Sequence, residues 1–129
     1  MVLLREQVYT AEECAARVSV MLGQYTGLVE TECLCMVEMI RQHVLPAVRT
    51  AGMTQYVAQL DDAVALLQSE LAAALALDEK EGAAAARNVR LQTMVTVRQL
   101  VDSIEAVVPP HLWTLATYHE LMFLDQTTE

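Results

Sequence analysis

The chain has 129 residues, is 54% hydrophobic, holds four Gly and three Pro, and has a net charge of −9. This length suits one domain with its own core, and a composition poor in turn residues favours an all-α fold over a sheet. The excess of acids argues against nucleic acid and anionic membrane surfaces as partners, and no apolar run reaches the ~20 residues of a membrane span.

The N-terminus lacks the basic and apolar pattern of a secretory signal, so we expect a cytoplasmic protein. Three cysteines, Cys14, Cys33 and Cys35, are an odd number and predict buried free thiols rather than a disulfide framework. Cys33 and Cys35 could form a metal site with His43. Helix positions two apart point about 200° apart, however, so we expect no metal ligands in this chain.

The first predicted helix runs from about residue 11 to about residue 50. Thr10 and Glu13 have the spacing of a capping box at its start. Pro46 lacks an amide and crowds the preceding turn, which predicts a kink, with helix termination near Ala51-Gly52. Apolar residues recur at helical spacing along its second half: Val29, Cys33, Met36, Ile40, Val44 and Ala47.

A long antiparallel helical hairpin is predicted over about residues 54–108, with a turn from Leu77 to Gly82. Both of its arms have apolar residues at steps of three and four. These residues are Val57, Leu60, Val64, Leu67, Leu71 and Ala74 in one arm, and Met94, Val97, Val101, Ile104 and Val108 in the other. Pro109-Pro110 ends the second arm. A short C-terminal helix is expected from about Thr117 to Leu124, which completes an all-α bundle.

Four residues are candidates for a structural or binding role. Glu32 lies beside an apolar helix face, where a charge should be paired, and Arg98 is a possible partner; a solvated or a functional Glu32 are the alternatives. Trp113 and Tyr118 follow the double proline and are expected to clamp the tail onto the bundle, with a ligand pocket as the alternative. We find no catalytic motif and no cofactor-binding motif.

Three separated motifs resemble type III glutamine synthetases. The tail resembles the end of that family at Leu112, Trp113, Leu115, Thr117, Tyr118, Glu120, Leu121 and Phe123, and departs from it at Thr114 and Ala116, where the family usually has Pro. The first helix is similar at Tyr25, Glu32, Leu34, Met36, Met39, Leu45, Pro46 and Ala47. The third helix is similar at Met94, Arg98, Asp102 and Glu105. The resemblance spans about residues 6–124.

The resemblance implies a helical domain that follows the catalytic core of a glutamate–ammonia ligase. In that family, earlier segments bind ATP, glutamate, ammonium and divalent ions (Mg or Mn), so none of the family's catalytic, cofactor or metal residues falls within these 129 positions. The implied partners are the catalytic core of the same enzyme and neighbouring subunits. One apolar surface should therefore be left exposed in the isolated domain, with self-association as the consequence.

Two other hypotheses remain. One is a free-standing helical module that pairs with partner helices. The apolar start Met1-Val2-Leu3-Leu4 looks like a chain entered midway and favours the synthetase fragment over this module. A small enzyme in its own right has little support, since no pair of titratable groups is spaced to converge.

Overall fold

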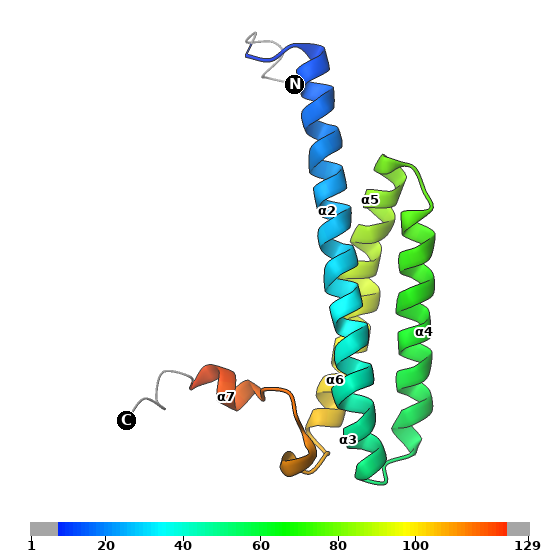
Figure 1. The fold of residues 1–129 in the computed structure, drawn as a ribbon, viewed down its shortest axis with the longest axis vertical. Coiled ribbons are helices and arrows are strands. Elements are labelled where there is room, and N and C mark those ends of the chain that lie inside the picture. The colour runs from blue at the N-terminus through cyan, green and yellow to red at the C-terminus, as the bar shows by residue number, and fades with distance from the viewer. Residues whose placement is uncertain (1–7, 124–129) are drawn as a thin grey trace.

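A computed structural model describes residues 8–123, and in this range the protein is an all-α bundle without strands (Figure 1). Its three long arms lie side by side and run in alternating directions. The first arm comprises α2 (Ala11–Met39), η1 (Ile40–Val44) and α3 (Leu45–Thr50). The second arm is α4 (Gln55–Leu75), and the third comprises α5 (Glu79–Asn88), η2 (Val89–Thr93) and α6 (Met94–Glu105). The tail carries η3 (Pro110–Leu112) and α7 (Tyr118–Met122).

The capping box predicted at the start of the first arm is present. The Thr10 hydroxyl accepts from the Glu13 amide at 3.2 Å, and the Glu13 carboxylate accepts from the Thr10 amide at 2.8 Å. The Thr10 amide and hydroxyl both donate to the Glu13 carboxylate, and these two hydrogen bonds lower the pKa of Glu13 because they favour its charged form. The same reciprocal arrangement joins Thr117 and Glu120 at α7, and it also lowers the pKa of Glu120.

The first arm remains helical through Pro46 and ends where the sequence predicted. In place of a simple kink, the turn before the proline is π-helical over Ile40–Val44, with the Leu45 amide donating to the Ile40 carbonyl. A π-helical turn is wider than an α-helical one and gives the proline ring room. The arm then closes at Gly52, whose φ of 72° lies in the left-handed region that favours glycine.

The core lies between the three arms and uses the predicted apolar seams. The α4 seam is buried from Leu60 to Ala74, and the seam of the third arm is buried at Met94, Val97, Ile104 and Val108. Val57, Val101 and Met36 are half-buried and pack at the edge of this core. The buried side chains of the first arm are Val29, Cys33, Val37, Ile40, Val44, Leu45, Ala47 and Val48.

The tip of the hairpin differs from the prediction. The turn is shorter than expected, since α5 begins at Glu79 with Asp78 as its N-cap, and Gly82 lies inside the helix. A Cβ on Gly82 would approach the Ala74 carbonyl oxygen to 2.9 Å, which is closer than atoms tolerate. Gly82, Ala83 and Ala86 are buried, so small side chains let the arms approach each other here.

The N-terminal part of α2 extends beyond the hairpin (Figure 1). Ser19 donates a hydrogen bond to Glu79 at the hairpin tip, and the helix before Ser19 stands above it. Val18, Val20 and Met21 are exposed there. None of the described helices is long and apolar enough to cross a membrane. The apolar start Met1–Leu4 lies outside the described residues. The last helix, predicted to run from about Thr117 to Leu124, is shorter and ends at Met122, with Phe123 as its C-cap.

Candidate functional site

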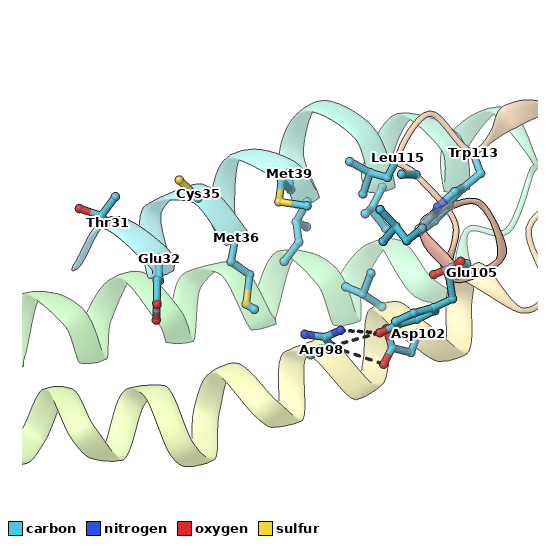
Figure 2. A pocket seen from close by; sticks show the side chains of 16 residues that line it. Thr31, Glu32, Cys35, Met36, Met39, Arg98, Asp102, Glu105, Trp113 and Leu115 are labelled. Atoms are coloured by element: carbon cyan, nitrogen blue, oxygen red, sulfur yellow. Dashed lines mark hydrogen bonds and ion pairs between the residues drawn. The ribbon is translucent and has the colours of Figure 1, made fainter. Parts of the chain in front are cut away.

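A groove of about 470 Å³ lies between α2, α6 and the C-terminal segment (Figure 2). Its walls are mostly apolar and come from Met36, Met39, Val101, Leu115 and Leu121. Polar groups occupy its edges, with Glu32 on α2 and Arg98, Asp102 and Glu105 on α6. An apolar groove with a few polar groups at its rim suits the binding of apolar side chains or of a small molecule.

All four candidate residues line this one groove. Helical periodicity places Glu32, Cys35, Met36 and Met39 on one side of α2, because positions three and four apart share a face. Arg98 belongs to α6, and Trp113 and Tyr118 come from the tail, which completes the lining of the groove. Segments distant in sequence thus bring the four residues together.

The predicted pair between Glu32 and Arg98 is wrong. Glu32 accepts from Arg90 at 3.1 Å instead, and both side chains keep about a third of their surface exposed, 35% for Glu32 and 37% for Arg90. Arg90 lies in η2, at the level of Glu32, whereas Arg98 is eight residues further along the third arm. That separation corresponds to roughly 12 Å along a helix.

Arg98 instead fastens the tail to α6. Its guanidinium donates two hydrogen bonds to the Tyr118 hydroxyl, at 3.2 Å from Nε and 2.6 Å from Nη2. The Tyr118 hydroxyl donates to Asp102 at 3.1 Å, and Asp102 lies 3.9 Å from the Arg98 Nε. The hydrogen bonds to Tyr118 raise the pKa of Arg98 above its ordinary value. Asp102 was not singled out as a site residue, although its spacing of four from Arg98 marks a helix pair.

Trp113 packs its ring against the core, and its Nε1 is buried without a hydrogen-bond partner in the described part of the chain. The next residue, Thr114, lies 2.7 Å from the Nδ1 of His43 through its hydroxyl. The clamp and the pocket proposed for Trp113 and Tyr118 are therefore compatible, since the side chains that hold the tail also line the groove.

The cysteines do not share one environment. Cys33 is fully buried, and burial, followed by the nearby charge of Glu70, raises the pKa of its thiol. Cys14 is half-buried, and Cys35 is exposed beside the groove, so the prediction of buried thiols is wrong for Cys35. Within residues 8–123 no cluster of three His, Cys, Asp or Glu has the arrangement of a metal site.

Most charged side chains at the edge of the groove form ion pairs or hydrogen bonds with neighbouring side chains. Glu32 is paired with Arg90, and Arg98 is hydrogen-bonded to Tyr118 and paired with Asp102. What the groove offers is therefore an apolar wall and a rim that is acidic at Glu105. This arrangement fits recognition of a helix or another apolar segment.

The chain matches a known protein family. A family model described as the glutamine synthetase C-terminal domain matches residues 1–68, which is more than half of the chain. In the described structure the match covers the first arm and the N-terminal two thirds of α4. A comparison with curated proteins found no match.

Proposed function

Because the chain belongs to the glutamine synthetase C-terminal domain family, we propose that it is a non-catalytic structural and oligomerisation domain of a type III glutamine synthetase. The parent enzyme would use ATP, with Mg or Mn, to join glutamate and ammonia into glutamine in the cytoplasm. The match over residues 1–68 is the observation that carries this proposal.

The type III assignment draws support from residues beyond that match. Arg98, Asp102 and Tyr118 belong to two separate motifs that resemble type III enzymes. In the fold they meet in one hydrogen-bonded cluster. Because the two motifs contact each other in the fold, we expect them to occur together in one family.

A role in contacts within the parent draws support from the apolar surface. Large apolar side chains are exposed on α2, including Val18, Met21, Leu28, Leu34 and Met39. Apolar surface of this extent on one element is typical of an interaction site. The catalytic core of the same chain, or a neighbouring subunit, would bury it.

The test is to remove the domain from the parent enzyme. We expect the truncated parent to lose its native oligomeric size in light scattering and analytical ultracentrifugation. The purified 129-residue chain should show no ATP-dependent γ-glutamyl transfer. Activity of that chain above background, or a truncated parent with unchanged size and stability, would contradict the proposal.

A free-standing interaction module is the second candidate, which the exposed groove itself favours. An immunoblot of source cells with an antibody against this domain separates the two. A band several times larger than 14.3 kDa supports a domain of a large synthetase. A band near that mass supports the free-standing module.

A further inference from the structure

The α2 helix carries a second apolar seam that is separate from the one facing the core. Its positions alternate in steps of four and three from Cys14 to Met39, which is the heptad spacing of a coiled coil, and all of them except Glu32 are apolar. The members are Cys14, Val18, Met21, Tyr25, Leu28, Glu32, Cys35 and Met39. Val18, Met21, Leu28, Cys35 and Met39 are exposed. At ~1.5 Å per residue this outer seam is about 37 Å long.

The two ends of the outer seam differ in a complementary way. At its N-terminal end, α2 overhangs the hairpin (Figure 1), and the Arg17 guanidinium lies 4.2 Å from the centre of the Tyr9 ring. At its C-terminal end, Cys35 and Met39 lie in the groove between α2, α6 and the tail (Figure 2). One end is a projecting helix, and the other end borders an apolar groove of about 470 Å³.

We propose that the outer seam binds the outer seam of a second copy of this chain, antiparallel and around a two-fold axis. In this register Tyr25 faces Leu28 of the second copy, Val18 faces its Cys35, and Cys14 faces its Met39. The overhanging end of each α2 then lies in the groove of the other copy. This inference rests on the proposed role in subunit contacts and names the contact.

Charge complementarity supports this orientation. Arg17 and Glu38 lie on the same flank of the outer seam, and neither forms an ion pair within residues 8–123. The antiparallel register brings Arg17 beside Glu38 of the second copy, twice around the axis. A parallel pair would put the flanks that carry Arg17 and Glu38 on opposite sides of the interface, without this ion pair, and would leave both grooves empty. Glu32, the one charged seam position, is already paired with Arg90 of its own chain.

The first test measures dimerisation of the full 129-residue chain by sedimentation equilibrium. Met21→Glu places a charge in the seam and should weaken dimerisation roughly a hundredfold, because the two-fold axis buries the charge twice. Val20→Glu is the matched control, since Val20 is on the same helix with similar exposure, 59% against 69% for Met21, and points away from the seam. A monomeric wild-type chain, or equal weakening by both variants, would overturn the pairing.

The second test fixes the orientation. Arg17→Glu and Glu38→Arg should each weaken the dimer at low salt, and the double variant should restore it. In a Cys14→Ser background, Val18→Cys should form a disulfide-linked dimer through Cys35 of the second copy. Residues 18 and 35 of one helix are about 26 Å apart, so they cannot join within one chain. A Cys35–Cys35 cross-link without Val18→Cys would indicate a parallel pair and refute the proposal.

These outcomes separate the pairing from the proposed function. Circular dichroism of every variant should show unchanged helix content, because the altered side chains are on the surface. If the isolated chain is monomeric while removal of the domain still breaks up the parent enzyme, the seam pairing is wrong and the role of the domain in assembly stands.

Discussion

The position of Glu32 predicted that it forms an ion pair but not which residue is its partner. The position of Glu32 beside an apolar face indicated a paired carboxylate, and the structure contains the pair. The identity of the partner depends on which turn of the third arm lies level with Glu32. Because the pair is about two thirds shielded rather than buried, its contribution to stability should be modest.

A double-mutant cycle tests this pair. Glu32→Gln and Arg90→Gln, alone and together, should give a coupling of about 0.5 kcal/mol in the free energy of unfolding, as is typical of partly exposed ion pairs. The measurement is urea denaturation of the four proteins. The same cycle between Glu32 and Arg98 serves as the control, and a coupling there as large as that with Arg90 would contradict the structure.

Among the elements, the tip of the hairpin shows how packing overrides local preference. Gly82 disfavours a helix, and this preference led to the prediction of a turn there. The helix nevertheless includes Gly82, because only a residue without a Cβ fits against the Ala74 carbonyl. The neighbouring Ala83 and Ala86 continue the same close contact.

We expect Gly82→Ala to lower the free energy of unfolding by about 1–2 kcal/mol, since the clash with backbone costs more than the helix propensity of Ala returns. Gly23→Ala is the matched control, because a Cβ there meets nothing within 4 Å. That control should raise stability by up to ~1 kcal/mol. Thermal denaturation compares them, and a stabilising Gly82→Ala would disprove the close approach.

The capping boxes predict a dependence on pH. The folded-state pKa values of Glu13 and Glu120 lie below their ordinary values, because hydrogen bonds from Thr10 and Thr117 favour the carboxylates. Their stabilisation is therefore fully present above the unfolded-state pKa of about 4.3 and is lost as the pH falls through the lower folded-state values.

Glu13→Gln keeps the capping geometry and removes the charge, so it isolates this effect. The variant should have a lower Tm than the wild-type chain at neutral pH, and the difference should disappear at acidic pH, below the folded-state pKa. Glu12→Gln, in the same first turn but outside the capping box, is the control. A Tm difference for Glu13→Gln that does not change with pH would show that the charge is irrelevant to the cap.

For the whole molecule, the tail determines whether the groove exists. The tail forms one wall of the groove, and it is held by Trp113 against the core and by Tyr118 on Arg98 and Asp102. The hydrogen bonds of Tyr118 join residues 16 and 20 positions apart across a double proline. The three arms would form a bundle without the tail, but the side of α2 that carries Met39 would then be open.

Tyr118→Phe removes the hydroxyl that links α6 to α7. We expect a loss of at most about 1 kcal/mol in the free energy of unfolding, because the hydrogen bonds are exposed. Amide hydrogen exchange in α7 should become faster, while exchange in α4 stays unchanged. Met122→Ala, on the same short helix and largely exposed, is the control. Unchanged exchange in α7 would show that Tyr118 does not hold the tail.

The fold was largely predictable from the sequence. For the site, the sequence predicted which residues take part but not how they are arranged. The seams of α4 and of the third arm, the box at Thr10 and the stop at Gly52 follow from local spacing and backbone chemistry. Glu32, Arg98, Trp113 and Tyr118 were recognisable as unusual residues in their surroundings. Neither the partner of Glu32 nor the meeting of all four at one groove could be read from spacing.

The sequence by itself determined the helices, their caps and the faces that they bury, because these depend on residues within a few positions of one another. Only the tertiary structure decided the level at which the arms lie beside each other. The close approach at Gly82 fixes that level at the tip of the hairpin, and the return of the tail to α6 closes the groove. Contacts between segments far apart in the chain do not show up as a periodic pattern in the sequence. The groove and the overhang of α2 are therefore visible only in the tertiary structure.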